Sequence, residues 1–227
     1  MISAVPVKTR HRILATSLQL FNEQGERQVT TNHLAAAMGM SPGNLYYHFK
    51  NKDAIIGELF THYAERMAAT LTFPDDHPLT QADKANLFER VLNVLWDFRF
   101  LHRDMTHLLE SAKLSAQYRT FSVQVLEQLR ELYRVQIAAG LIVADDDDID
   151  TLAITIWITA TNWVNFLHTT GLFNASVGNG NGDITEDMLR RGILHVICLE
   201  APYLRGEAKA GLVALKARYG TALASDD

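Results

Sequence analysis

Residues 41–52 gather side chains that hydrogen-bond well to a nucleic acid. Asn44 has an amide that can pair with two atoms on the edge of adenine. Tyr46 and Tyr47 have hydroxyl groups that can reach phosphates, and their rings can pack on sugars or thymine methyl groups. Lys52 carries a positive charge suited to a phosphate oxygen. The residue types in this segment therefore predict binding to DNA through hydrogen bonds and charge.

These side chains need a support, and residues 29–53 predict two short helices joined by a tight turn. Thr30 or Thr31 can cap the first helix, because a hydroxyl oxygen accepts a hydrogen bond from an otherwise unpaired backbone N–H. Ser41 can cap the second helix, and Pro42 suits its first position, where the missing N–H of proline costs nothing. The segment therefore predicts a helix, a turn and a second helix.

The second predicted helix has a narrow apolar stripe. Leu45 and Phe49 lie one turn apart and are its apolar anchors, whereas its other positions are polar, aromatic or small. Such a helix presents a polar surface to its surroundings. Two helices in this arrangement form a helix-turn-helix, whose second helix enters the major groove of DNA.

The strings TTNHLA (residues 30–35), LYYHFKNK (45–52) and AIIGEL (54–59) resemble, without a gap, the DNA-binding segment of the TetR family of bacterial regulators. The resemblance is specific over residues 13–59, and the rest of the chain has a compatible helical pattern. Side-chain chemistry and this resemblance together select the candidate DNA-binding residues. They are Thr31, Asn32, Ser41, Gly43, Asn44, Tyr46, Tyr47, His48 and Lys52.

The individual roles within this set follow from chemistry or from the resemblance. Thr31 lies at a helix N-terminus, where its hydroxyl and free N–H groups can hold a phosphate. Lys52 looks like the phosphate-binding lysine of the family, and Asn32 and Asn44 are the candidates for adenine contacts. In the namesake of the family, arginine and glutamine read bases at the positions of Asn32 and Pro42. The operator sequence therefore cannot be carried over.

The charge of the chain is unevenly distributed. The 227 residues have the composition of an ordinary globular protein, with 48% hydrophobic and 21% charged residues and a net charge of −5. Residues 1–52 have a net charge of +4 and residues 53–227 a net charge of −9. This division would turn the N-terminal end toward phosphate, and the basic cluster at residues 8–12 could lie along the DNA backbone. The single cysteine, Cys198, excludes an internal disulfide and is expected to be a small buried side chain.

A long uncharged segment could be mistaken for a membrane span. Residues 151–182 contain no Lys, Arg, Asp or Glu, but threonine and asparagine interrupt them. The apolar part is shorter than the roughly 20 residues that a bilayer requires. The N-terminus has no apolar export signal. We therefore expect a cytoplasmic, nucleoid-associated protein with no membrane partner, in which this segment is a buried helix.

Further helices are expected throughout the chain. Asp104 is expected to cap a short helix, and the acidic residues 145–148 to favour the N-terminus of another. A Gly- and Asn-rich loop is expected at residues 174–182. The predicted helices run over residues 8–24, 52–71, about 80–101, 104–112, 117–140, 149–170, 185–201 and 207–223.

The sequence contains no recognisable catalytic constellation. It lacks a Gly-rich phosphate loop, a nucleophile elbow, an HExxH motif and paired CxxC motifs, so we predict neither an enzyme nor a cofactor. Glu58, His62 and Glu65 have a helical spacing that could ligate a metal. A solvated helix face is the favoured interpretation, and no metal site is predicted.

The resemblance implies a helical C-terminal domain with a pocket for a small-molecule effector of unknown identity. Such a pocket is mostly apolar and has a few polar groups. Thr155, Thr159 and Asn162 form a polar stripe on an otherwise apolar helix, which needs partners from a second subunit, a ligand or water. Packing in the core is the alternative role for aromatic residues at helical spacing. The candidate effector-pocket residues are Trp96, Phe100, His107, Tyr118, Trp157, Thr159, Asn162 and Trp163.

Together these features predict an all-α protein with two functional domains. Residues 1–52 would form a three-helix DNA-binding domain, 52–72 a connecting helix, and 73–227 a larger domain for effector binding and dimerisation. The helices at 149–170 and 185–201 would form the interface of a homodimer, because a helix-turn-helix protein reads palindromic operators by two-fold symmetry. The predicted function is regulation of transcription on double-stranded operator DNA, as a repressor rather than an activator. Alternatives are a helical protein-interaction module and an enzyme with an appended DNA-binding module.

Overall fold

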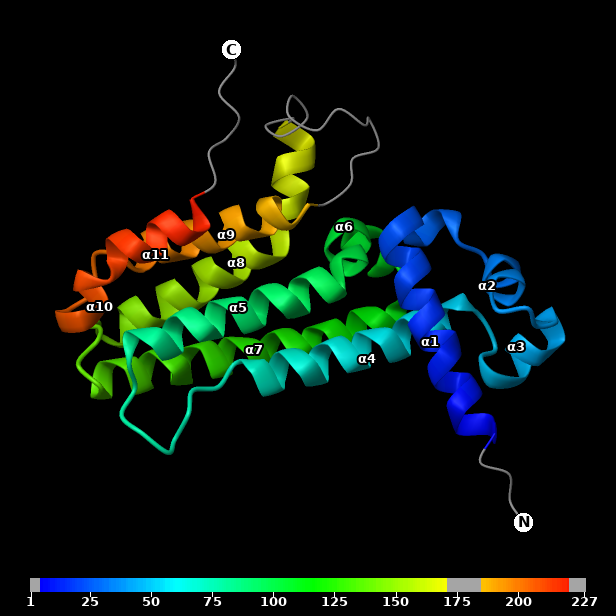
Figure 1. The fold of residues 1–227 in the computed structure, drawn as a ribbon, viewed down its shortest axis with the longest axis horizontal. Helices are drawn as coiled ribbons and strands as arrows, with labels where there is room; N and C mark the ends of the chain where they lie inside the picture. Colours follow the sequence, from blue (N-terminus) through cyan, green and yellow to red (C-terminus); the bar gives the residue numbers. More distant parts are fainter. Residues whose placement is uncertain (1–4, 171–184, 221–227) are drawn as a thin grey trace. The chain divides into compact units, whose positions relative to one another are not determined.

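The computed structural model describes residues 5–170 and 185–220. Within these ranges the chain is helical and has no β-strand, although an isolated antiparallel bridge joins Ile142 to Leu204. The predicted all-α fold is therefore confirmed (Figure 1). The loop expected at residues 174–182 lies outside the described residues. The elements are α1 (Val5–Gln24), the 3-10 turn η1 (Glu26–Gln28), α2 (Thr31–Ala37), α3 (Pro42–His48), α4 (Lys52–Thr70), α5 (Gln81–Asp97), α6 (Arg99–Leu108), α7 (Ala112–Ala138), α8 (Asp146–Thr170), α9 (Glu186–Glu200), α10 (Gly206–Ala210) and α11 (Leu212–Tyr219).

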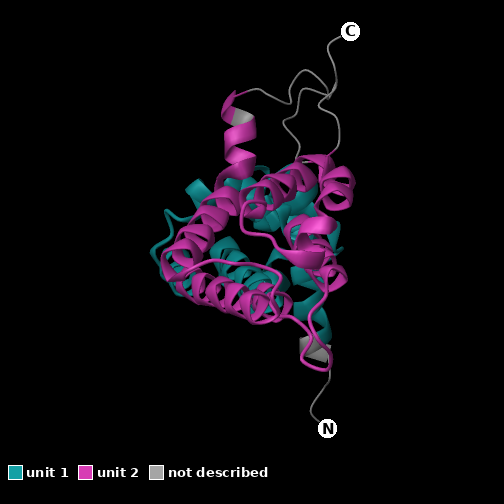
Figure 2. Cartoon of the chain, turned by 90° about the vertical axis from the view of Figure 1, so that its left-hand side faces the viewer, with its two compact units in different colours: residues 1–66, 97–120 teal, residues 67–96, 121–227 magenta. Residues whose placement is uncertain are grey.

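The helices form two compact units, which Figure 2 shows in different colours. Unit 1 comprises residues 1–66 and 97–120, and unit 2 comprises residues 67–96 and 121–227. Helices α4 and α7 each contribute residues to both units. Compactness therefore groups α6 and the first part of α7 with the helix-turn-helix. The division predicted from the sequence separates a DNA-binding domain from an effector-binding and dimerisation domain. It describes functions rather than compact units, and it stays a prediction.

The helix-turn-helix forms where the sequence predicts it, because both short helices have their caps. Thr30 Oγ1 accepts from the N–H of His33 at 3.2 Å, and the Thr30 N–H donates to His33 Nδ1 at 3.5 Å, which completes a capping box. Ser41 Oγ accepts from the N–H of Asn44 at 3.2 Å. Gly39, between the two helices, has φ of +63°, the left-handed region that favours glycine.

Apolar side chains from α1 to α4 hold the helix-turn-helix to the rest of unit 1. Their burial removes apolar surface from water, which is the main stabilising contribution to a fold of this kind. As a result, α2 and α3 need few buried residues of their own. The fully buried members include Ile13 and Phe21 from α1, Leu34 from α2, Leu45 from α3, and Ile55 and Leu59 from α4.

One predicted helix is divided in two. The helix expected to continue to residue 101 ends at Asp97, and α6 begins at Arg99. Asp104 was expected to cap a later helix, but this prediction is wrong because it lies inside α6. Its carboxylate instead accepts a hydrogen bond from the backbone N–H of Glu26, at 3.3 Å. Asp104 therefore pairs with a backbone group 78 residues away in the sequence instead of capping its own helix.

Unit 2 is built mainly from α5, α7, α8 and α9, followed by the short helices α10 and α11. The acidic residues 145–148 lie at the N-terminus of a helix, as predicted, because 146–148 form the first turn of α8. In addition, Asp145 Oδ1 accepts from the N–H of Asp148 at 2.8 Å. None of the helices in the described ranges is both long and apolar enough to cross a membrane. A core cluster of buried residues joins α7, α8 and α10; it comprises Tyr133, Leu141, Ile142, Ile149, Leu152, Leu204 and Ala208.

Candidate nucleic-acid interface and interior cavity

Helix α3 exposes most of its side chains. Leu45 is its one buried residue, whereas Tyr47 is 78% exposed and Tyr46 47% exposed. Asn44 is exposed on the same short helix. The helix therefore presents two phenol hydroxyls and an amide, which are groups that bind phosphates and base edges.

Helix α2 adds its N-terminus to this surface. The hydroxyl oxygens of Thr31 on α2 and Tyr46 on α3 lie 3.1 Å apart, so the first turn of α2 lies beside α3. Asn32, the next residue of α2, is exposed. The structure therefore places eight of the predicted DNA-binding residues on α2, on α3 or at the cap of α3. These are Thr31, Asn32, Ser41, Gly43, Asn44, Tyr46, Tyr47 and His48.

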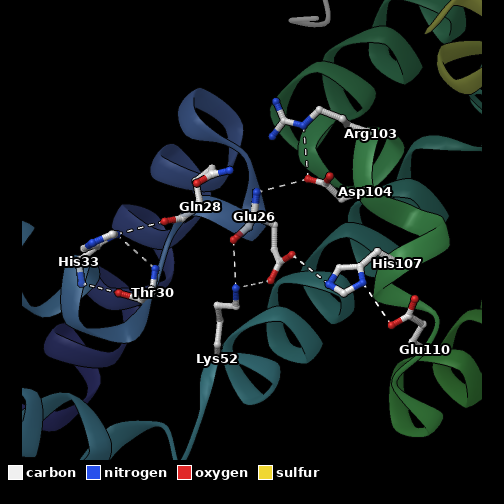
Figure 3. A network of polar contacts seen from close by, with 9 residues as sticks. All are labelled: Glu26, Gln28, Thr30, His33, Lys52, Arg103, Asp104, His107 and Glu110. Atoms are coloured by element: carbon white, nitrogen blue, oxygen red, sulfur yellow. Dashed lines mark hydrogen bonds and ion pairs between the residues drawn. The ribbon is translucent and has the colours of Figure 1, made fainter. Parts of the chain in front are cut away.

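Lys52, the ninth predicted residue, has a partner inside the protein. Its ammonium lies 2.6 Å from Oε1 of Glu26 and donates to the backbone carbonyl of Glu26 at 3.0 Å (Figure 3). The side chain of Glu26 is 3% exposed and that of Lys52 is 25% exposed. Because an ammonium has three N–H donors, one remains for another acceptor. The phosphate contact of Lys52 stays a prediction, and the structure adds an internal ion pair to it.

Glu26 is the centre of a polar network that the sequence did not reveal (Figure 3). Its backbone N–H donates to Asp104 Oδ2, which also accepts from Arg103 Nε at 3.3 Å. The other carboxylate oxygen of Glu26 lies 3.9 Å from His107 Nε2, and His107 Nδ1 lies 3.3 Å from Oε2 of Glu110. The network therefore joins η1 and the start of α4 to α6 within unit 1.

Arg10, in the basic cluster of α1, also has partners within unit 1. Its Nη1 donates to the carbonyl of His48 at 2.7 Å, and its Nε donates to Glu58 Oε1 at 3.1 Å. Its guanidinium carbon lies 4.1 Å from the centre of the Phe49 ring. Arg10 therefore holds α1 to the C-terminal end of α3 and to α4. The exposed basic residues on either side of it remain candidates for the phosphate backbone.

The metal-like spacing on α4 has an ordinary explanation. Glu58 forms the ion pair with Arg10. Within the described ranges, no group of three or more His, Cys, Asp or Glu side chains could hold a metal ion. Glu58, His62 and Glu65 are therefore interpreted as a helix face with one interhelical ion pair.

Unit 2 contains a cavity of about 110 Å³ among α5, α7, α8 and α9. Aliphatic and aromatic side chains form most of its wall. Four polar or charged residues also line it: Lys84 from α5, Tyr133 and Gln136 from α7, and Glu200 from α9. Each is at most 4% exposed, so their polar groups need partners from one another, from ordered water or from a bound molecule.

Three of these side chains are in direct contact. Lys84 Nζ lies 2.7 Å from Glu200 Oε2, and the hydroxyl of Tyr133 donates to Glu200 Oε1 at 2.6 Å. Burial, and then the charge of Glu200, raise the pKa of Tyr133 well above its ordinary value, so the hydroxyl keeps its proton and donates. Gln136 Nε2 donates to the carbonyl of Leu132 at 3.1 Å. Gln136 Oε1 is buried and has no hydrogen-bond partner among the described residues.

Of the eight predicted effector-pocket residues, Trp163 lines this cavity. Phe100, His107 and Tyr118 belong to unit 1 instead. Phe100 is fully buried in the core, His107 joins the Glu26 network, and the ring of Tyr118 lies 6.1 Å from that of Phe60. Helical spacing identifies the face on which a residue lies, but it does not identify the helix that covers that face.

The remaining four residues lie in unit 2 but do not line the cavity. Trp157 packs on Phe121, with ring centres 5.8 Å apart. Thr159 Oγ1 and Asn162 Nδ2 donate to carbonyls one turn earlier in α8, at 2.8 and 3.2 Å. The polar stripe of α8 therefore finds partners in its own backbone, as Thr and Asn side chains often do within helices. Trp96 at the end of α5 completes this group.

Helix α8 has an exposed face without charge. Ile154 is 40% exposed, Ile158 54% and Phe166 44%, and Asn162 is exposed between them. These residues recur every four positions and so lie along one stripe of the helix. On α9, Cys198 is exposed, which contradicts the expectation that it is buried. Both helices that the sequence predicts for a dimer interface thus have accessible uncharged side chains.

Two family models match the chain. The TetR model described as "Bacterial transcriptional repressor" matches residues 62–212, which is more than half of the chain. The model described as "Bacterial regulatory proteins, tetR family" matches residues 13–59, which contain α2 and α3. Between them, the two models match residues in both compact units.

Individual relatives agree with these matches. A TetR-family transcriptional regulator from Marinobacter aquaeolei VT8 is 38% identical, with a TM-score of 0.79 over 93% of this chain and 98% of its own. Two curated relatives from Bacillus subtilis, the probable HTH-type transcriptional regulator YttP and the uncharacterized HTH-type transcriptional regulator YerO, are 23% identical over 103 and 185 residues. These matches cover 45% and 80% of this chain, but 49% and 62% of the relatives' own lengths. By these matches the chain belongs to the TetR family of bacterial regulatory proteins.

Proposed function

We propose that this protein is a transcriptional regulator that represses genes by binding an operator in double-stranded DNA. The exposed surface of α3 carries the proposal, because Asn44, Tyr46 and Tyr47 lie on a helix with a single buried residue. The excess of positive charge in residues 1–52 supports it, since such a charge attracts phosphate. Membership of the TetR family supports it as well. The protein would act on chromosomal DNA in the cytoplasm.

A homodimer would present two copies of α3 to the two halves of a palindromic operator. The uncharged exposed stripe of α8 supports an interface there, because apolar side chains at such exposure are stabilised by burial against a second copy. Ile158→Glu places a charge in the middle of this stripe. We expect the variant to be monomeric by light scattering while its helical content is unchanged. If the variant remains dimeric, the interface does not lie at this stripe of α8.

The cavity of unit 2 would hold the effector. Its apolar wall with a few buried polar groups supports this role. An effector lowers operator affinity only if it binds more tightly to the protein conformation with lower affinity for DNA. Binding of the effector in the cavity would thus regulate binding of DNA at the surface of α2 and α3.

A binding-site selection from random duplex DNA tests the proposal. The recovered sequence should be palindromic, and its affinity should fall steeply as the salt concentration rises. Asn44→Ala should change the selected bases more than the overall affinity, because base contacts determine specificity. Asn93→Ala, an equivalent change at an exposed position of α5, is the control and should select the wild-type sequence. Weak salt dependence with no selected sequence would favour a protein-interaction module.

A further inference from the structure

The polar groups at the cavity of unit 2 indicate what kind of molecule it accepts. This inference rests on the proposed role of the cavity as an effector site. The cavity is about 110 Å³, whereas an apolar cavity of roughly 150 Å³ accommodates benzene. A short chain fits this volume as it stands, and a single ring is the upper limit, because it requires small movements of the side chains in the wall. The mainly apolar wall requires most of its surface to be apolar.

A count of donors and acceptors shows which polar groups remain available. Both oxygens of Glu200 are engaged, one by Tyr133 and the other by Lys84. Trp163, which also lines the cavity, already donates its ring N–H to the carbonyl of Met188 at 2.7 Å. Among the N–H donors, two of the three of the Lys84 ammonium remain, because it forms no other contact among the described residues than the one with Glu200.

The second available group is an acceptor. Gln136 Oε1 is buried without a hydrogen-bond partner in the part of the chain that the structure describes. Gln136 lies one turn after Tyr133 on the same face of α7, and Tyr133 contacts Glu200. The available donor and the available acceptor therefore both belong to residues that line this cavity, and Gln136 lies one turn from the tyrosine that contacts the partner of Lys84.

We infer that the cavity takes a small, uncharged, mainly apolar molecule with a hydroxyl group. A hydroxyl oxygen accepts from Lys84, and its hydrogen is donated to Gln136 Oε1, so a single group satisfies both. A carboxylate would accept from Lys84 but would meet the negative charge of Glu200 and the partial negative charge of Gln136 Oε1. An ammonium would meet the positive charge of Lys84. The existing pair of Lys84 and Glu200 therefore selects against charged molecules of both signs.

Three molecules of similar size test this inference on the full-length protein. Phenol has the hydroxyl, toluene replaces it by a methyl group, and benzoate replaces it by a carboxylate. The dissociation constant of each is measured by isothermal titration calorimetry. We expect phenol to bind about tenfold or more tightly than toluene, because toluene leaves buried polar groups without partners. Benzoate should bind more weakly than phenol by at least the same factor.

Two matched variants connect this preference to the cavity. Gln136→Leu removes the acceptor and should reduce the preference for phenol over toluene to less than threefold. Gln128→Leu is the same change two turns earlier in α7, where Nε2 donates to the carbonyl of Ala68 at 3.0 Å away from the cavity wall. It should retain the full preference. Neither change leaves an unpaired charge in the interior, so both proteins should fold.

The outcomes separate this inference from the proposed function. Equal binding of phenol and toluene, tighter binding of benzoate, or a full preference in Gln136→Leu would overturn the hydroxyl assignment and leave the cavity as an effector site. Failure of all three molecules to bind at millimolar concentration would overturn both the assignment and the cavity as a site for molecules of this size. Binding to the selected operator is measured separately, so neither result depends on the DNA-binding proposal.

Discussion

Replacing Lys52 by methionine removes the cation that faces the buried carboxylate of Glu26. The Lys52 ammonium lies 2.6 Å from Glu26 Oε1, and the Glu26 side chain is 3% exposed. Breaking a fully buried ion pair costs about 3–5 kcal/mol, because the remaining charge has no partner. Since Lys52 is one-quarter exposed and His107 Nε2 lies 3.9 Å from the other oxygen, we expect a smaller loss of about 2 kcal/mol. For a protein of this size that loss lowers Tm by about 4–8 °C.

Changing Glu26 to glutamine in the same chain should recover most of this loss. The double variant Glu26→Gln, Lys52→Met has no unpaired charge, so its Tm should lie within about 3 °C of the wild type. Thermal unfolding followed by circular dichroism measures all four members of the cycle. A Tm unchanged in Lys52→Met, or a double variant less stable than Lys52→Met, would refute the argument that this pair stabilises unit 1.

The same double variant isolates the predicted phosphate contact of Lys52 from its structural role. With folding restored, each lost phosphate contact should reduce the slope of log K against log salt concentration by about 0.9. The measurement is fluorescence anisotropy of labelled operator DNA at several salt concentrations. A slope equal to that of the wild type would retire the phosphate assignment and leave Lys52 as a structural residue.

Three further predictions concern separate parts of the molecule. Tyr47→Ala, at a side chain that is 78% exposed, should leave Tm unchanged and weaken binding to operator and non-operator duplexes alike; unchanged DNA affinity would exclude Tyr47 from the interface. Burial lowers the pKa of His102 to about 4, so between pH 4 and 6.5 the unfolded chain binds more protons than the folded chain, and stability falls as the pH falls. Urea unfolding should show a loss of about 2 kcal/mol from pH 7 to pH 5 that is absent in His102→Leu, and equal losses in both proteins would contradict this. Gly192→Ala would put a Cβ 2.8 Å from Cδ1 of Trp163, so it should lower the free energy of unfolding by about 1–3 kcal/mol. Gly57→Ala, where the nearest atom to the added Cβ lies at 3.5 Å, should instead raise it by about 1 kcal/mol through the helix propensity of alanine in α4. Thermal unfolding measures both variants, and Tm shifts of the same sign would count against this packing argument.

Local signals explain why the helix-turn-helix could be predicted. The hydroxyls of Thr30 and Ser41 each accept from a backbone N–H three residues later. The turn between the two helices depends on the positive φ of a single residue, Gly39. The cap at Asp145 follows the same logic, because its carboxylate accepts from the N–H of Asp148, three residues later. Such interactions are encoded within one turn of helix, so one sequence is enough to identify them.

The polar end of the cavity could not be predicted in the same way. Lys84, Tyr133 and Glu200 come from three helices that are distant in the sequence, and only the packing of unit 2 brings them into contact. One signal was available. Lys84 lies three positions before Leu87 and Glu200 three positions after Ile197, so each charge extends an apolar helix stripe. A charged residue in an apolar stripe indicates a buried partner, although it does not identify that partner.

The exposure of Cys198 on α9 has a practical consequence. Because the sequence contains one cysteine, a maleimide reagent modifies each chain at a single known atom. The reaction rate then reports how open this part of α9 is, without any engineered label site. We expect slow modification of the assembled protein and fast modification of Ile158→Glu. A fluorophore attached there in the monomeric variant would follow reassembly with the wild-type chain in real time.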